Sequence, residues 1–99
     1  MFLVRDVFKC KPGQAKALIE KFQRSMSLLE NAEGFNSFRI LVDYVSSYWT
    51  VVLESEVDDL AQFEQHMREW GETAQVQEVM SGYMDLVDSG GYREIFRIV

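Results

Sequence analysis

Residues 90–99 read GGYREIFRIV, and this stretch decides the fold class. Gly90 and Gly91 predict a turn, and the residues Tyr92–Val99 then alternate in the way that is typical of a β-strand. The chain also opens on a strand pattern, Phe2–Cys10. A chain that begins and ends with a strand, with one helix after the first strand and another before the last, is predicted to be a βαββαβ unit.

Four more elements complete this order. Apolar residues at three- and four-residue spacing predict two helices, and alternating apolar residues predict two strands joined by a short hairpin. In chain order these elements are a helix over Gln14–Asn31, strands over Phe35–Tyr44 and Tyr48–Ser55, and a helix that begins near Asp58 and Asp59 and breaks or bends at Gly71. A further helical stretch then continues toward Val87, and a turn follows at Asp88–Gly91.

Length and composition restrict the class of protein. At 99 residues, of which 47% are hydrophobic, residues 1–99 are expected to form one domain with a single core. Acidic residues outnumber basic ones by 16 to 10, which disfavours binding to nucleic acid. The single cysteine, Cys10, cannot form an intrachain disulfide and is expected to be a small core residue. No apolar run approaches the roughly 18 residues of a membrane span, so a cytoplasmic protein without membrane partners is expected.

The predicted strands have two different faces. One face is apolar and needs helices to cover it, and it is expected to include Phe2, Val4, Phe8, Phe96 and Ile98. The other face mixes charged and aliphatic residues, which is typical of a sheet that packs on a second sheet. We therefore expect a homodimer through this face, with the contact residues Arg39, Leu41, Val52, Ile95 and Arg97. The alternative is a monomer whose sheet face is partly solvated.

The segments FLVRDVFKCKPGQAKAL (residues 2–18) and SGGYREIFRIV (residues 89–99) resemble the dimeric α+β barrel superfamily. This superfamily includes antibiotic-biosynthesis-monooxygenase-like proteins, stress-responsive barrel proteins and NIPSNAP-type domains, and the ending looks most like the NIPSNAP type. The resemblance implies a ferredoxin-like α+β monomer with helices on one face of an antiparallel sheet, two of which form a barrel. It also implies a pocket between sheet and helices. Some relatives are cofactorless oxygenases or haem-degrading enzymes.

Two carboxylates interrupt the apolar strand faces. Asp6 lies between Val4 and Phe8, and Glu94 lies between Tyr92 and Phe96. The first and last strands of a ferredoxin-like sheet are neighbours, so both carboxylates are predicted to lie under the helices. Two carboxylates close together have pKa values that move apart, which suits proton transfer. The alternative is that each lies at the rim or forms an ion pair with a Lys or Arg.

His66 is the only histidine, and helical spacing places it at the edge of the buried stripe of the second predicted helix. There it is a candidate general base at the pocket mouth, although a surface histidine without a role is the alternative. One His and one Cys predict no metal site, and we expect no cofactor. Aromatic residues are candidates for the pocket wall or simply for the core, namely Tyr44, Trp49, Trp70 and Tyr83.

The sequence therefore favours a small dimeric α+β barrel that binds or oxidises a small organic molecule without a metal. Asp6, His66 and Glu94 are its candidate catalytic residues, and Tyr44, Trp49 and Tyr83 are its candidate pocket residues. The alternatives are a non-enzymatic binding or assembly module, and a haem-binding or haem-degrading enzyme in which His66 ligates the iron by analogy with relatives. Whether the protein is an enzyme stays open at this point.

Overall fold

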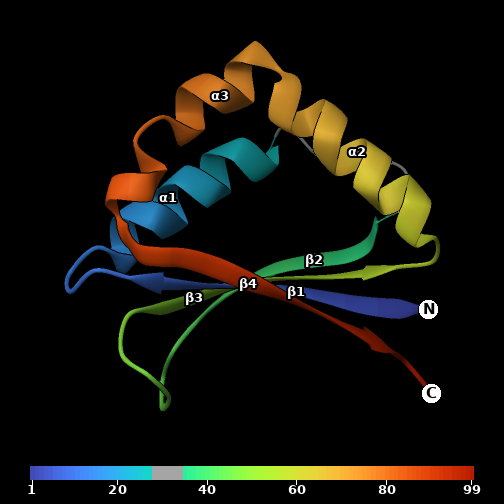
Figure 1. Ribbon diagram of the computed structural model, residues 1–99, viewed down its shortest axis with the longest axis horizontal. Coiled ribbons are helices and arrows are strands. Elements are labelled where there is room, and N and C mark those ends of the chain that lie inside the picture. Colours follow the sequence, from blue (N-terminus) through green and yellow to red (C-terminus); the bar gives the residue numbers. More distant parts are fainter. Residues whose placement is uncertain (28–34) are drawn as a thin grey trace.

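The computed structural model describes residues 1–27 and 35–99, and it has the predicted βαββαβ order (Figure 1). Its elements are β1 (Phe2–Cys10), α1 (Ala15–Met26), β2 (Phe35–Val42), β3 (Thr50–Val57), α2 (Leu60–Glu72), α3 (Ala74–Met80), the short 3-10 helix η2 (Tyr83–Asp85) and β4 (Val87–Arg97). The predicted end of the first helix, at Asn31, lies outside the described residues.

The four strands form one antiparallel sheet in the order β2-β3-β1-β4. The described helices all cover one face of this sheet, and none of them lies on the other face (Figure 1). We call the uncovered side the open face. The α+β ferredoxin-like class is thus confirmed, and the first and last strands are neighbours as expected.

Two element bounds differ from the prediction at the β2–β3 hairpin. β2 ends at Val42 and β3 begins at Thr50. Asp43 closes the ladder there, since its Oδ1 accepts a hydrogen bond of 2.8 Å from the Thr50 backbone N–H and its own N–H donates to the Thr50 carbonyl at 3.1 Å. Trp49 adopts a φ of 63°, a left-handed conformation that takes the chain out of the strand before Thr50.

The second helical region is split into two helices, as one of the two expectations had it, but the split lies at Thr73 rather than at Gly71. The Asp59 side chain caps α2 as expected, accepting hydrogen bonds from the N–H groups of Ala61 and Gln62 at 2.9 and 3.2 Å. The helix then ends at Glu72, Thr73 follows with an extended backbone, and α3 begins directly after Thr73. Gly71 therefore lies inside the last turn of α2.

β4 begins at Val87, so the prediction of a turn over Asp88–Gly91 is wrong. Val87 pairs with Cys10. The register of the β1–β4 pair shifts between Phe8, which pairs with Gly91, and Cys10. Gly91 makes this pairing possible because a side chain there would collide with the carbonyl oxygen of Val7. Gly91, one of the two glycines that suggested a turn, thus permits a close approach of two strands.

The register of β4 also reverses its predicted faces. Val4 pairs with Ile95, Asp6 with Arg93 and Phe2 with Arg97. Residues that lie directly opposite each other in an antiparallel pair share a face, so Arg93, Ile95 and Arg97 lie on the helix side. The predictions that Ile95 and Arg97 belong to the sheet face of a dimer, and that Phe96 lies under the helices, are therefore wrong.

The core occupies the space between sheet and helices in two clusters. Both include residues from β1 and β3, and each is closed by different helices. The larger cluster contains Cys10, Ala15, Leu18, Phe22, Val51, Leu53 and Val87, and the smaller contains Val4, Val57 and Phe63. Cys10 is a buried core residue, as expected. Among residues 1–27 and 35–99, no helix is long and apolar enough to cross a membrane.

Candidate functional site

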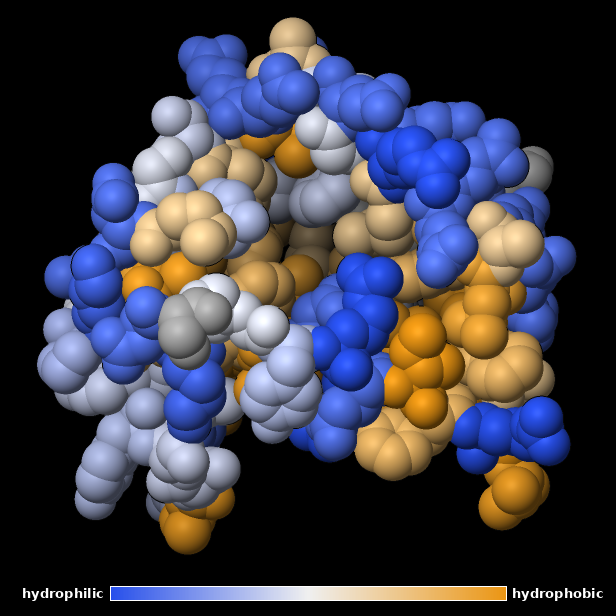
Figure 2. Space-filling view, in the orientation of Figure 1, coloured by the Kyte–Doolittle hydropathy of each residue, from blue (hydrophilic) through white to orange (hydrophobic). Residues whose placement is uncertain are grey.

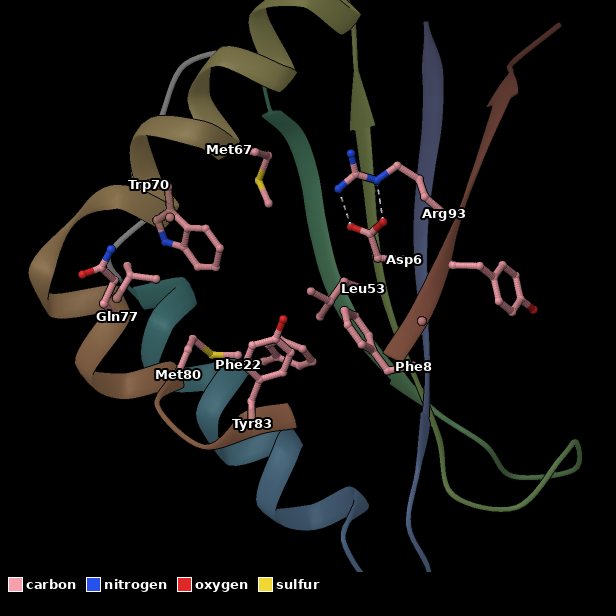
Figure 3. A pocket seen from close by; sticks show the side chains of 14 residues that line it. Asp6, Phe8, Phe22, Leu53, Met67, Trp70, Gln77, Met80, Tyr83 and Arg93 are labelled. Atoms are coloured by element: carbon pink, nitrogen blue, oxygen red, sulfur yellow. Dashed lines mark hydrogen bonds and ion pairs between the residues drawn. The ribbon is translucent and has the colours of Figure 1, made fainter. Parts of the chain in front are cut away.

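A cavity of about 760 Å³ lies between the helices and the sheet. Figure 2 shows a hollow between the helices with apolar residues around it. Most of the lining is apolar or aromatic, and the polar side chains are few. The lining consists of Asp6, Phe8, Phe22, Leu53, Met67, Trp70, Gly71, Val76, Gln77, Met80, Tyr83, Gly91, Tyr92 and Arg93 (Figure 3). A concave, mostly apolar space with a few converging polar groups is the usual form of a small-molecule site.

Hydrogen bonds between helices hold the cavity walls in place. The Lys21 ammonium of α1 donates to the carbonyls of Val79 and Ser81 at 3.2 and 2.8 Å, at the C-terminal end of α3. Cations favour such ends because the last carbonyls lack helical partners. Trp70 Nε1 of α2 donates to the Ser25 carbonyl of α1 at 3.2 Å. The indole N–H of Trp70 is thus already used, and its ring forms part of the wall.

An ion pair between Asp6 and Arg93 forms the charged part of the wall. Arg93 Nε lies 2.6 Å from Asp6 Oδ1 and Nη2 lies 3.1 Å from Oδ2, so the contact is bidentate (Figure 3). The hydrogen bond to Asp6 raises the pKa of Arg93, burial opposes this shift, and the charges of Asp6 and Glu64 add to it. The guanidinium also lies 5.4 Å from the centre of the Phe63 ring. The pair brings no net charge to the cavity.

Tyr83 provides a neutral polar group opposite the ion pair. Its ring comes from η2, and its hydroxyl is directed into the cavity toward the sheet (Figure 3). A phenol hydroxyl both donates and accepts hydrogen bonds. The cavity therefore offers aromatic and aliphatic walls, the Tyr83 hydroxyl and one neutralised ion pair, with Gln77 and Tyr92 as the other polar residues of its lining. This arrangement suits a flat, largely apolar molecule that carries a small number of polar atoms.

The predicted carboxylate pair is wrong. Asp6 lies on the cavity wall, but Glu94 lies on the open face, where its Oε1 is 3.6 Å from Arg5 Nη1. The reason is the register of β4, in which Glu94 pairs with Arg5 and Arg93 pairs with Asp6. Asp6 accordingly has a cationic neighbour instead of a second carboxylate, which was the alternative interpretation of these residues.

The aromatic wall was predicted in part. Tyr83 and Trp70 line the cavity, whereas Tyr44 and Trp49 do not. Tyr44 is 99% exposed and Trp49 is 42% exposed, because both lie in the hairpin beyond the last paired residues of β2 and β3. The prediction that these two residues form a pocket wall within the same chain is wrong.

His66 is half-buried on α2 and is not among the residues that line the cavity. Its roles as a general base and as a haem ligand stay predictions that this placement does not support. In the described part of the chain, no three His, Cys, Asp or Glu side chains gather as ligands of a metal ion would.

Sequence reasoning missed Arg93 and the glycines of the cavity. Arg93 alternates in phase with Ile95 and Arg97, which were expected on the dimer face, because the apolar pattern of β4 fits either phase. A related signal is Gly91, since a glycine inside a strand pattern indicates a close approach of another strand rather than a turn. Gly71 was interpreted only as a helix breaker, but it lines the cavity with open space at its Cα.

Comparisons with known proteins agree with this fold. A family model described as antibiotic biosynthesis monooxygenase matches residues 1–80. Protein Atu4242 from Agrobacterium tumefaciens is similar in structure, with a TM-score of 0.83 at 10% identity over 100% of this chain and 94% of that chain. Protein SO0527 from Shewanella oneidensis has a TM-score of 0.73 at 20% identity, over 96% and 87% of the two chains.

A third similar structure is Rv0793 from Mycobacterium tuberculosis, with a TM-score of 0.73 at 11% identity over 99% of this chain and 94% of that chain. At such identities the likeness of these structures concerns the fold alone. No curated protein matches the sequence of this chain. The narrower resemblance to NIPSNAP-type domains stays a prediction.

Proposed function

Since the chain belongs to the antibiotic biosynthesis monooxygenase domain family, we propose that its cavity takes up a small, largely apolar organic molecule, which the protein binds or oxidises without a metal. The observation that carries this proposal is the cavity of about 760 Å³ whose apolar walls enclose the Tyr83 hydroxyl and the Asp6–Arg93 pair. A space of this size is within the range of natural small-molecule sites, which is roughly 300–1,000 Å³.

The charged groups of the cavity wall indicate which class of ligand fits the cavity. Asp6 already neutralises Arg93, so a neutral ligand does not leave either group unpaired. Burying an unpaired charge is costly, which disfavours ligands that displace one partner without replacing it. The Tyr83 hydroxyl is suited to a carbonyl or hydroxyl on the ligand. We therefore propose a neutral aromatic ketone or phenol as the ligand class.

Trp70 allows a direct binding test. The chain has two tryptophans, and Trp49 lies in the exposed hairpin, so Trp49→Phe leaves a single fluorophore on the cavity wall. The planar aromatic ketone 9-fluorenone should quench Trp70 fluorescence in this variant with saturation. Tyr83→Phe should weaken binding about 2- to 10-fold, the value of one hydrogen bond, whereas Tyr44→Phe at the exposed hairpin should not.

Gly71 supplies the matched pair that locates the ligand. A side chain at Gly71 meets open space at the cavity wall, so Gly71→Phe should fill the cavity and abolish saturable quenching. Gly71→Ala removes the same glycine with little added volume and should bind 9-fluorenone as the parent does. Equal quenching in Gly71→Phe and Gly71→Ala would mean that the ligand binds elsewhere, and the proposal would fail.

The oxidising half of the proposal has a separate measurement. With 1,4-dihydroxynaphthalene as the probe, two electrons and two protons pass to dioxygen, which gives 1,4-naphthoquinone and hydrogen peroxide. The chelator-treated protein should consume oxygen faster than Gly71→Phe does under the same conditions. If the two rates are equal while 9-fluorenone still binds, the protein is a binding module rather than an oxidase.

We also propose that the chain acts as a cytoplasmic homodimer that is joined through the open face. Members of this family are typically homodimers. Three of the predicted contact residues, Arg39, Leu41 and Val52, share the open face with Arg5 and Glu54 through their register. This surface favours the second candidate function, a non-enzymatic assembly module, which sedimentation of the wild-type protein as a monomer would exclude.

A further inference from the structure

One turn of α1 holds both of the helices that wall the cavity. Lys21 and Ser25 are four residues apart in α1, so they lie on the same side of that helix. The Lys21 ammonium donates to the carbonyls of Val79 and Ser81 at the end of α3, and the Ser25 carbonyl accepts a hydrogen bond from Trp70 of α2. This turn therefore fixes where α2 and α3 lie relative to the rest of the core.

The Lys21 contact supplies a partner that α3 itself lacks. α3 has seven residues, and a helix of this length is not stable by its own hydrogen bonds. The last carbonyls of any helix have no partner within the helix. No basic residue lies in the last turn of α3, and its cap residue, Ser81, closes one backbone hydrogen bond of 3.3 Å to the Glu78 carbonyl. The ammonium that reaches across from α1 therefore determines how the end of α3 is held.

The end of α3 leads directly to the hydroxyl in the cavity. Ser81 is two residues before Tyr83, and the residue between them is a glycine with a φ of 82° that turns the chain into η2. At the other end of this short segment the Lys11 backbone N–H donates to the Leu86 carbonyl at 2.8 Å. The segment that carries Tyr83 is thus anchored by a backbone contact on one side and by the Lys21 side chain on the other.

The position of the Tyr83 hydroxyl depends on both anchors. The hydroxyl is directed into the cavity toward the sheet (Figure 3). A hydrogen bond to a ligand requires the two oxygens to lie about 2.5–3.0 Å apart, so a displacement of about 1 Å is enough to lose it. Removal of the ammonium frees the α3 side of the segment and leaves the Leu86 side in place. The aromatic ring then remains at the cavity, but its hydroxyl is no longer fixed.

We propose that Lys21 is a positioning residue of the cavity, which places the Tyr83 hydroxyl where a carbonyl or hydroxyl of the ligand meets it. This inference rests on the ligand proposed above and adds a determinant of its recognition. Lys21 is not among the residues that line the cavity, so its effect on the ligand passes through α3 and η2.

A pair of ligands separates positioning from general support of the wall. 9-Fluorenone has a carbonyl, and fluorene has the same ring system without it. In the Trp49→Phe protein, Lys21→Met should weaken 9-fluorenone about 2- to 10-fold, the value of one hydrogen bond. It should leave the affinity for fluorene, measured by displacement of 9-fluorenone, within about twofold. Lys16→Met, at an exposed lysine of the same helix, is the matched control and should change neither affinity.

A second substitution shows whether the effect passes through the hydroxyl. In Tyr83→Phe the hydroxyl is already absent, so Lys21→Met should cause no further loss of 9-fluorenone affinity. The same loss with and without the hydroxyl, or an equal loss for both ligands, would mean that Lys21 only supports the wall and would overturn the inference. Unchanged binding of 9-fluorenone in Lys21→Met would overturn it as well.

The position of Tyr83 can also be followed without a ligand. With 3-fluorotyrosine at all four tyrosines, the ¹⁹F resonance of Tyr83 is the one that disappears in Tyr83→Phe. Lys21→Met should move this resonance and leave that of Tyr92, which lines the same cavity from β4, in place. A Tyr83 resonance that does not move, or that moves no more than the Tyr92 resonance, would contradict the positioning role.

This measurement keeps the two proposals distinguishable. If 9-fluorenone does not bind but the Tyr83 resonance moves, the ligand proposal fails and the positioning role stands. If 9-fluorenone binds and Lys21→Met changes neither its affinity nor the resonance, the positioning role alone fails. Should Lys21→Met not fold, Lys21→Gln takes its place with the same expected results, since the glutamine side chain is uncharged and one bond shorter.

Discussion

Asp6 and Arg93 occupy a place that an apolar pair would fill in an ordinary core. Asp6 lies between Val4 and Phe8 on the helix side of β1, where both neighbours pack into the core. Its carboxylate is stabilised by two hydrogen bonds from Arg93, and the pair faces the cavity. Partly buried ion pairs are seldom retained for stability alone, since apolar residues of similar volume often serve as well. Their presence on this wall is consistent with a role in ligand selection.

The variant Asp6→Asn leaves Arg93 without its carboxylate. The side chains of Asp6 and Arg93 are 16% and 41% exposed, so the pair lies between the exposed and the buried extremes. We expect the free energy of unfolding to fall by about 1–2 kcal/mol, between the values for those extremes. Urea unfolding measures this change. The exposed carboxylate Asp58 provides the control, and an Asp6→Asn loss no larger than that of Asp58→Asn would contradict the expectation.

Cys10 gives the stability a defined pH dependence. Burial raises the pKa of the Cys10 thiol above its usual 9.0, and the charges of Asp43 and Asp88 add to the shift. Above that pH the unfolded chain loses the thiol proton while the folded chain keeps it. The contribution of the thiol to the free energy of unfolding is therefore fully present below about pH 9. It is lost as the pH rises toward the pKa of the folded state, by at most about 1.4 kcal/mol per pH unit.

Urea titrations between about pH 8 and pH 10.5 test this dependence, with Cys10→Ala as the comparison. The alanine variant is less stable at every pH, but its stability should decline less steeply above pH 9. Parallel profiles for the two proteins would show that the thiol keeps its usual pKa in the folded state.

Among the elements, β1 was predictable and β4 was not. Only one face of Phe2–Cys10 is strongly apolar, so its alternation alone predicts which residues meet the helices. In β4 both phases contain large apolar residues and charges, because Tyr92, Glu94 and Phe96 alternate with Arg93, Ile95 and Arg97. Periodicity cannot choose between such sets, and a shift of one residue moves every side chain to the other face. The prediction that Asp6 and Glu94 lie together is wrong for this reason, and for the same reason the sequence did not predict the Asp6–Arg93 ion pair.

The observed register of β4 requires a glycine at position 91. A Cβ atom at this position would collide with the backbone carbonyl of Val7, which cannot move without breaking the β1–β4 ladder. We expect Gly91→Ala to lower the free energy of unfolding by about 1–3 kcal/mol, as overpacking does in other proteins. Thermal or urea unfolding checks this value.

Gly71→Ala is the matched control for Gly91→Ala. Gly71 lies in α2 and has open space around its Cα, so alanine there should stabilise the protein by about 0.5–1 kcal/mol through helix propensity. A loss of stability in both variants would indicate a general intolerance of the fold to added methyl groups rather than a close approach at Gly91.

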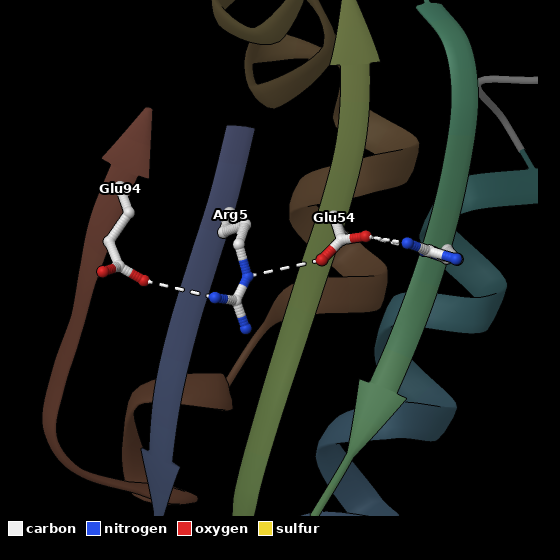
Figure 4. Close-up of polar contacts among 4 residues, drawn as sticks. Arg5, Glu54 and Glu94 are labelled. Carbon is white, nitrogen blue, oxygen red and sulfur yellow. Dashed lines mark hydrogen bonds and ion pairs between the residues drawn. The ribbon is translucent and has the colours of Figure 1, made fainter. Parts of the chain in front are cut away.

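At the scale of the whole molecule, the two faces of the sheet carry different features. The helix side carries the cavity, and the open face carries a row of alternating charges formed by Glu94, Arg5, Glu54 and Arg39 (Figure 4). The class of fold followed from the order of elements, and the family model that matches residues 1–80 agrees with it. β4 lies beyond the matched residues, yet it contributes Arg93 to the cavity and Glu94 to the row of charges on the open face. The last strand therefore contributes polar groups to both faces of the sheet.

Substitutions at two adjacent residues of β4 test the two faces of the sheet separately. Ile95 and Phe96 are 47% and 48% exposed in the single chain, but Ile95 pairs with Val4 on the helix side and Phe96 pairs with Leu3 on the open face. Phe96→Asp places a carboxylate between the sheets, so the dimer should weaken at least about tenfold. Ile95→Asp should leave the dissociation constant within about threefold of wild type. Sedimentation velocity over a range of concentrations measures both constants. A reversed order of effects would return Ile95 to the interface and refute the β4 register that places Arg93 at the cavity and Glu94 on the open face.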